Sequence, residues 1–247
     1  MPFTMKHSES SIHQKGTSLL GRYQDYLGEF VYGGIDGSVT TFAVVTGAVG
    51  AGMDSSVILI LGFANLFADG FAMSVGAYMS SKSEKQNYEK HKSLEYWEVE
   101  HLPELEREEI EDIYRKKGFE GPLLGQVVEV ITRDKDRWVN EMMKDELNLI
   151  EDTKSPFQTG LVTFLSFVSI GLIPLGVYVF DFLSPSVQNL FAWSSGLTAV
   201  GFILIGYLKS IVTQSGILKG IGETLLLGGL AAFVAYFVGD FLGKVIY

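Results

Sequence analysis

The sequence predicts an all-α, polytopic membrane protein with five transmembrane helices and a helical domain inserted between the second and the third. Two observations predict this class. Of the 247 residues, 47% are hydrophobic and 19% are charged, which is more apolar than is usual for a soluble protein. The charges also crowd into residues 82–157 and leave long stretches almost free of them. This segregation indicates lipid around the uncharged stretches and water around the charged block.

Each predicted span is a mostly apolar stretch near the length of about 20 residues that a helix needs to cross a bilayer. Two of these stretches precede the charged block and three follow it, and all contain glycine, which lets helices approach closely in lipid. The predicted spans cover approximately 30–51, 57–78, 159–180, 190–208 and 221–242.

The charged block predicts four helices in water. The second span continues into the first of them as far as His101, because no helix breaker intervenes. Pro103 then begins a helix at a position where its missing N–H costs nothing. Gly121 and Pro122 open a third helix, and the last is expected to run to about Asp152.

The placement of Lys and Arg predicts the orientation, since cytoplasmic loops carry an excess of both. Basic residues lie before the first span, in the charged block and after the fourth span, whereas the loops 52–56 and 181–189 have none. The N-terminus and the charged block are therefore expected in the cytosol. The expected parts are an N-terminal cytosolic segment (1–28), spans one and two (29–80), a helical cytosolic domain (81–155) and spans three to five (156–247).

The composition excludes several classes of site. The chain has no Cys, so disulfides and thiolate metal sites are excluded, and its four His lie outside the apolar stretches. A metal site inside the membrane would therefore use oxygen or thioether ligands. The net charge of −10 argues against nucleic acid as a partner and fits a protein that attracts cations. No prosthetic group is expected.

One acidic residue lies in the first span. Because an ionised carboxylate in hydrocarbon is costly, Asp36 is a candidate functional residue, with Thr40 one turn further along the same helix. The alternative interpretation is that Asp36 lies near the water boundary and caps the helix.

The second span carries a polar stripe. Asn65, Asp69 and Met73 follow one another at intervals of four residues, so they share a helix face. The amide and carboxylate oxygens alone would suit Mg²⁺ or Ca²⁺, and a thioether adds a ligand that favours transition metals. The alternative is that Met73 is an ordinary packing residue.

The charged block holds a second group of candidate ligands. Two Glu-x-x-Glu pairs place carboxylates on helix faces, and Glu106 and Glu109 have isoleucine, not a basic residue, four positions on. A solvated acidic surface is the alternative interpretation, since acidic helices produce this spacing by chance. The candidate metal ligands are Glu95, Glu98, Glu106, Glu109, Met142, Met143 and Glu146.

These features together resemble the vacuolar iron transporter family, which includes plant and fungal vacuolar iron/manganese transporters and prokaryotic relatives. The resemblance extends from about Leu27 to the end of the chain. It is carried by Gly34-Ile35-Asp36-Gly37, Val39-Thr40, Met73-Ser74-Val75-Gly76-Ala77-Tyr78, Lys82-Ser83-Glu84, Glu95-x-x-Glu98, Pro103, Glu106-x-x-Glu109, and Trp138 followed by Met142-Met143-x-x-Glu146-Leu147.

The resemblance implies a homodimer that exports Fe²⁺, and also Mn²⁺, Co²⁺ or Zn²⁺, from the cytosol in exchange for protons. It places Asp36 and Met73 in the ion pathway between subunits and the seven candidate ligands in the cytosolic metal-binding domain of one branch of the family. The expected location is the vacuolar membrane in a eukaryote and the cell membrane in a prokaryote. Asn65 stands where the plant transporters have Glu, and Glu29 where the family has Asp, so proton coupling could differ.

Two other functions compete with transport. A membrane-anchored ferroxidase or iron-storage protein would place carboxylates on facing helices, usually with Glu-x-x-His pairs. Glu98 followed by His101 is the nearest match. A metal sensor that uses its spans only as an anchor is the other alternative, although the acidic residues within the spans argue against it.

Overall fold

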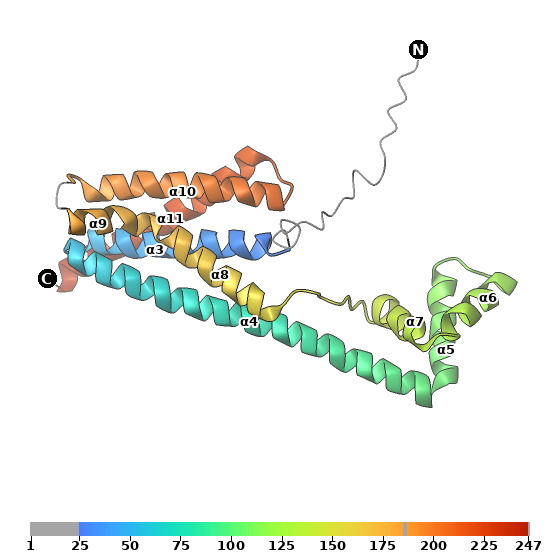
Figure 1. Cartoon of the computed structure of the whole chain (residues 1–247). Helices are drawn as coiled ribbons and strands as arrows, with labels where there is room; N and C mark the ends of the chain where they lie inside the picture. Colours follow the sequence, from blue (N-terminus) through green and yellow to red (C-terminus); the bar gives the residue numbers. More distant parts are fainter. Residues whose placement is uncertain (1–24, 185–186, 247) are drawn as a thin grey trace, which may run out of the picture. The chain divides into compact units, whose positions relative to one another are not determined.

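The computed structural model describes residues 25–184 and 187–246, and every regular element in these ranges is a helix (Figure 1). The all-α class is therefore confirmed. The chain forms two compact units. Unit one comprises the described residues up to Tyr78 and from Pro156 onward, and unit two comprises Met79–Ser155. Helix α4 (Ser55–His101) contributes residues to both.

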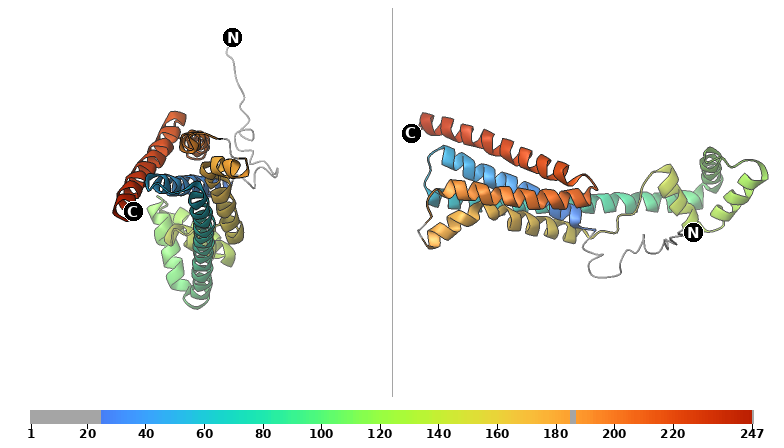
Figure 2. Two further views of the ribbon diagram at one scale, coloured as in Figure 1. Left: turned by 90° about the vertical axis from the view of Figure 1, so that its left-hand side faces the viewer. Right: turned by 90° about the horizontal axis from the view of Figure 1, so that it is seen from above.

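Unit one is a bundle in which α3 has the central place. Helix α3 packs against α8, α10 and α11, and α10 also packs against α9 and α11 (Figure 2). The apolar core of unit one includes Val45 of α3, Leu66 of α4 and Phe167 of α8, all of which are fully buried. Besides the first part of α4, the helices are α3 (Leu27–Gly50), α8 (Pro156–Gly171), α9 (Ile173–Leu183), α10 (Leu190–Val212) and α11 (Ile217–Ile246).

Three helices among the described residues, α4, α10 and α11, are long and apolar enough to cross a membrane. The pair α8 and α9 makes a fourth candidate if the two helices are counted as one span. Helix α3 has 24 residues, contains Glu29, Asp36 and several Gly and Thr residues, and is not among these candidates. The chain is thus a multi-pass membrane protein, and a fifth span at α3 stays a prediction.

The third predicted span differs from the expected single helix. Helices α8 and α9 meet at a break at Leu172 and are bent by 54° relative to each other. Pro174 lies in the first turn of α9, where it has no N–H to donate and its ring would clash with the carbonyl oxygen of Ile170 in a straight helix. The bend still lets Leu175 reach the core of unit one, where it is fully buried.

Close helix contacts in unit one depend on glycine. Gly37 of α3 lies directly against the backbone of Phe167 on α8, and Gly239 of α11 lies against the backbone of Gly47 on α3. A Cβ at Gly37 or Gly239 would collide with backbone atoms, which cannot rotate aside as a side chain can. These glycines therefore let the helix axes approach more closely than any larger residue would allow.

Unit two consists of short helices that follow the end of α4. They are α5 (Pro103–Lys116), α6 (Gly121–Thr132), α7 (Lys135–Glu141) and the π-helical turn η1 (Met142–Glu146). Asp134 caps α7 by accepting a hydrogen bond from the Arg137 N–H at 2.9 Å. The prediction that the last helix runs to Asp152 was wrong, because Asn148 adopts a φ of 53°, which a right-handed helix cannot continue.

Candidate metal centre

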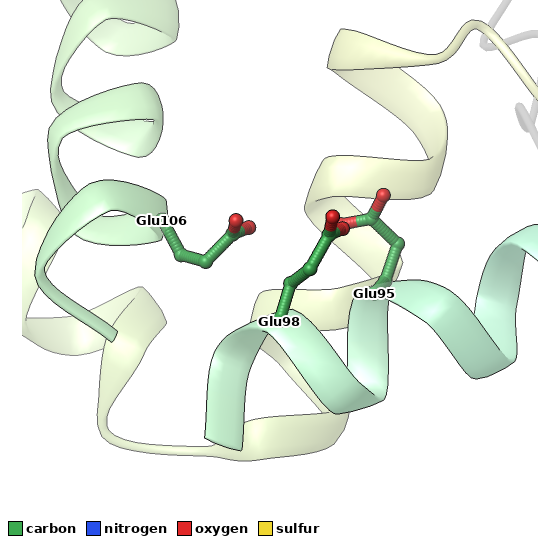
Figure 3. Close-up of side chains that lie close together, drawn as sticks. All are labelled: Glu95, Glu98 and Glu106. Atoms are coloured by element: carbon green, nitrogen blue, oxygen red, sulfur yellow. The ribbon is translucent and has the colours of Figure 1, made fainter. Parts of the chain in front are cut away.

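Three glutamate side chains converge in unit two (Figure 3). Glu95 and Glu98 are one turn apart on α4, so their carboxylates project from the same face. The chain turns at Leu102, and the Glu106 N–H bonds to the Leu102 carbonyl oxygen at 3.2 Å, which places Glu106 in the first turns of α5. One carboxylate oxygen from each glutamate lies within 4.8 Å of the others. We call these three residues the carboxylate cluster.

The carboxylate cluster is unusually well shielded from solvent for an acidic group. Glu95 is 4% exposed and Glu106 is 5% exposed. Burial first, and neighbouring carboxylates second, raise the pKa of Glu95 to about 8 and that of Glu106 to about 7. Within the described residues, one oxygen of each has no hydrogen-bond partner. A divalent cation would supply both the missing partner and the missing positive charge.

Two more of the predicted ligands lie within reach of the carboxylate cluster. The charges of Glu109 and Glu146 both act on Glu95, and the side chain of Glu146 is hydrogen-bonded to that of Glu109. Burial and the nearby Glu109 raise the pKa of Glu146. As whole residues Glu109 and Glu146 are exposed, unlike the buried pair Glu95 and Glu106, although the carboxyl group of Glu146 is partly shielded from water. The structure thus brings together five predicted carboxylates from α4, α5 and η1.

The two predicted thioether ligands are core residues in this structure. Met142 is 0% exposed and Met143 is 1% exposed. Both belong to the apolar core of unit two, together with Ile110 and Val139. Packing alone accounts for their burial, so their role as metal ligands stays a prediction.

Unit one holds a second group of acidic side chains. Asp36 on α3 and Asp69 on α4 are half-buried, and their charges are close enough to act on each other. We call them the aspartate pair. The interpretation of Asp36 as a helix cap is wrong, since α3 begins at Leu27 and Asp36 lies more than two turns inside it. The Thr40 hydroxyl donates to the Asp36 carbonyl oxygen at 2.8 Å, so its proton is used within the helix.

The other predicted pathway residues lie on the same two helices. Asn65, Asp69 and Met73 share a face of α4 because they are spaced four residues apart on one helix, and all three are half-buried. Met73 packs against the apolar core of unit one. Glu29 lies in the first turn of α3, where the positive end of the helix dipole favours a carboxylate.

One feature of unit two was not predicted from the sequence. The segment Met142–Glu146 forms a π-helical turn, in which the Leu147 N–H bonds to the Met142 carbonyl oxygen at 3.2 Å. Such turns contain an extra residue and occur frequently at functional sites. The apolar positions before it continue the spacing of an ordinary α-helix, so no local pattern of residues indicates the wider turn.

Helices long and apolar enough to span a membrane, an acidic pair on α3 and α4 and a buried carboxylate cluster describe a multi-pass membrane protein with candidate cation sites. A family model described as the VIT family matches residues 27–240. The chain belongs to this family, whose name stands for vacuolar iron transporter, and the resemblance found in the sequence is confirmed.

Similar proteins carry that name. The vacuolar iron transporter of Toxoplasma gondii is 35% identical, over 90% of this chain and 76% of its own length. The vacuolar iron transporter of Plasmodium falciparum is 32% identical, over 87% of this chain and 82% of its own. Vacuolar iron transporter 1 of Oryza sativa subsp. japonica is 33% identical, over 84% of this chain and 82% of its own.

Proposed function

We propose that this chain exports divalent transition metals, Fe²⁺ first among them, from the cytosol across a bilayer in exchange for protons. The observation that carries the proposal is the aspartate pair, which is half-buried on two helices of a membrane unit. Acidic residues are rare in such helices and typically mark ion pathways. The relatives are named iron transporters, which makes iron the first candidate substrate.

The available ligands set the class of metal. Oxygen and thioether donors accept Fe²⁺, Mn²⁺, Co²⁺ and Zn²⁺, so these ions are the proposed substrates. The metal is cargo, and no prosthetic group takes part in the proposal. Protons compete with metal for the same carboxylates, so a proton gradient could drive release of the metal on the far side.

The proposed pathway follows α3 and the first part of α4. Asp36 and Met73 would hold a partly dehydrated ion, with Asp69 supplying a second negative charge. Asn65 and Thr40 offer neutral oxygens along the same two helices, and Glu29 lies in the first turn of α3. Neutralising a carboxylate with either a metal ion or a proton avoids the cost of an isolated charge in lipid.

Unit two would act as a cytosolic collecting domain. At neutral pH the raised pKa values of Glu95 and Glu106 keep these carboxyls partly protonated, so an arriving cation can displace protons from the carboxylate cluster. Glu98, Glu109 and Glu146 would complete an oxygen-rich site, and Met142 and Met143 would add thioethers once they turn from the core.

The assembly is proposed as a homodimer with five spans in each subunit, the fifth being α3. Exposed apolar side chains cover much of α11, including Leu226, Leu230 and Phe233, as expected for contact with lipid or a second copy of the chain. The N-terminus and unit two are proposed to face the cytosol, because the basic residues gather there.

The ferroxidase alternative receives no support. Members of the VIT family are transporters and not enzymes, and the chain is one of them. His101, which would complete the Glu-x-x-His motif, is exposed and stacks on Trp97, with its Nδ1 2.8 Å from the Trp97 carbonyl oxygen. That contact leaves the ring outside the carboxylate cluster.

The experiment that tests the pathway is Fe²⁺ uptake by proteoliposomes under an imposed pH gradient. Asp36→Ala and Met73→Ala should each lose uptake, because each removes a proposed pathway ligand. Asp240→Ala is a matched control, since Asp240 pairs with Lys244 on its own helix at 2.7 Å. Uptake at the wild-type rate in both pathway variants would remove the proposed route through the membrane.

A further inference from the structure

The π-helical turn η1 carries Glu146, so its geometry decides where this carboxylate lies. The turn is five residues long and directly follows α7, which ends at Glu141. Single π-helical turns are rare compared with α-helical ones, and unusual backbone conformations persist where the surrounding contacts favour them. The contacts that fix the two ends of η1 therefore bear on the position of Glu146.

A lysine from another helix bridges the two ends of the turn. Lys117 directly follows α5, and its Nζ lies 2.6 Å from Asp145 Oδ2, inside the turn. The same Nζ lies 3.2 Å from Glu141 Oε1, just before the turn. Tyr114 supports this arrangement, because its hydroxyl donates to Glu141 Oε1 at 2.5 Å and Lys117 Nζ lies 4.4 Å from the centre of its ring. We call these four residues the lysine clamp.

The lysine clamp is more protected than an ordinary surface ion pair. The side chains of Glu141 and Asp145 are 22% and 20% exposed, and that of Lys117 is 37% exposed. By contrast, Arg115 in the last turn of α5 is 53% exposed and, among the described residues, forms ion pairs with Glu111 and Asp112 of its own helix. Ion pairs of the second kind contribute little, whereas the lysine clamp connects two separate elements.

The two connected elements both carry proposed metal ligands. Helix α5 provides Glu106 and Glu109, and η1 provides Glu146, which is hydrogen-bonded to Glu109. Glu141 and Asp145 are paired with Lys117. Glu146 is therefore the acidic residue of this segment that remains to face the carboxylate cluster. Loss of Lys117 would let η1 return to α-helical spacing, and a one-residue shift in register rotates a side chain by about 100° around the axis.

We propose that Lys117 is a positioning residue of the metal centre: by bridging Glu141 and Asp145 it holds the π-helical turn so that Glu146 reaches the metal bound by the carboxylate cluster. The inference rests on the proposed function of unit two as a metal-collecting domain. It assigns the metal no contact with Lys117, which acts only through Glu146.

The test measures Co²⁺ binding to the full-length protein in detergent, by calorimetry and by the visible absorption of the bound ion. Lys117→Met should weaken binding roughly threefold to fivefold, the loss expected when an exposed ligand such as Glu146 no longer reaches the metal. Lys117→Arg should restore most of the affinity, because it keeps the charge and the donors. Arg115→Gln is the matched control and should bind like the wild type.

The spectrum separates positioning from a general loss of stability. At saturating Co²⁺, Lys117→Met should show altered visible bands, because the bound ion has lost the Glu146 oxygen. A residue that only stabilises the fold would change the amount of folded protein and leave the spectrum of the bound ion as in the wild type, which would overturn the proposal. If Lys117→Met does not fold, Asp145→Asn removes the negative charge from the shorter ion pair and is measured in the same way.

Two further variants separate this inference from the proposed function. Lys117→Met should add no further loss of affinity in a Glu146→Gln background, because both changes remove the same contact. Independent, additive losses would overturn the positioning role. If Glu106→Gln leaves Co²⁺ binding unchanged, the metal centre itself is wrong. If Glu106→Gln weakens binding and Lys117→Met does not, only the role of Lys117 is wrong.

Discussion

The carboxylate cluster of unit two and the aspartate pair of unit one contain the same chemical group but differ in how many carboxylates they bring together. The cluster gathers three glutamates within 4.8 Å, with Glu109 and Glu146 beside them. The aspartate pair has two carboxylates on neighbouring helices of a membrane unit. A site with many ligands binds an ion tightly, whereas a site with few ligands binds it weakly. Weak binding suits a pathway, because a conducted ion must be able to leave its site again. The difference fits the proposed division between a domain that collects the ion and a pathway that passes it on.

The largest expected effect comes from neutralising the aspartate pair. Asp36→Asn or Asp69→Asn should reduce Fe²⁺ flux in proteoliposomes to that of protein-free vesicles, because the ion loses its charged stop inside the membrane. Co²⁺ binding by unit two should be unchanged in the same preparations. A variant that keeps its flux and loses Co²⁺ binding would reverse the proposed division.

The next largest effect should come from the carboxylate cluster. Glu106→Gln keeps the shape of a buried side chain but removes its charge, so metal affinity should fall at least about tenfold. Transport should become slow at low Fe²⁺ concentration and recover at high concentration, because the pathway itself is intact. The check is Fe²⁺ flux measured over a range of Fe²⁺ concentrations. A maximal flux that stays below that of the wild type at high Fe²⁺ concentration would contradict a purely collecting role.

A smaller effect concerns pH. Because the folded protein raises the pKa of Glu95 to about 8 and of Glu106 to about 7, it holds their protons more tightly than the unfolded chain, where both titrate near the ordinary glutamate pKa of 4.5. The resulting stability is fully present below pH 4.5 and is lost as pH rises through 7 to 8. The metal-free unfolding midpoint should therefore fall as the pH rises from 5 to 8.

Tryptophan fluorescence during heating gives that midpoint, because Trp138 is buried in the core of unit two. Two controls sharpen the result. The double variant Glu95→Gln with Glu106→Gln should remove most of the pH dependence of the midpoint. In the wild type, saturating Co²⁺ should reduce the fall of the midpoint with rising pH. A midpoint that rises between pH 5 and pH 8 would show that the two carboxyls are not held protonated.

The smallest effect should follow from changing the edge of the cluster. Glu109 is exposed, and an exposed charge contributes only about 0.2–1 kcal/mol. Glu109→Gln should thus reduce Co²⁺ affinity by no more than about fivefold, which is less than the loss in Glu106→Gln. Equal losses in the two variants, measured by calorimetry, would mean that burial does not distinguish the ligands.

Helix periodicity explains which parts of this picture the sequence could predict. The spacing of Glu95 and Glu98 placed them on one face, and the absence of a breaker predicted that α4 continues to His101. Glu106 was distinguished by its lack of a basic residue one turn away. The bend at Pro174 could have been predicted from the sequence as well, because proline within an apolar helix is a reliable signal for a kink.

Contacts between distant segments could not be predicted in this way. The bonds from Lys117 to Glu141 and Asp145 join residues 24 and 28 positions apart, and a basic residue at a helix end has an ordinary explanation in the helix dipole. The interaction of Asp36 with Asp69 likewise depends on how α3 and α4 pack. Met142 and Met143 continue an apolar stripe begun by Trp138 and Val139, so their spacing fits a core as well as a metal site.

The most direct test of proton-coupled export follows metal and protons in the same vesicles. Purified wild-type protein is reconstituted, Fe²⁺ is added outside, and metal entry and internal pH are recorded together with and without an imposed pH gradient. We predict protein-dependent Fe²⁺ entry that is accelerated by an acidic interior and accompanied by a rise in internal pH. Fe²⁺ entry with no change in internal pH would contradict proton exchange, and no protein-dependent entry would contradict transport itself.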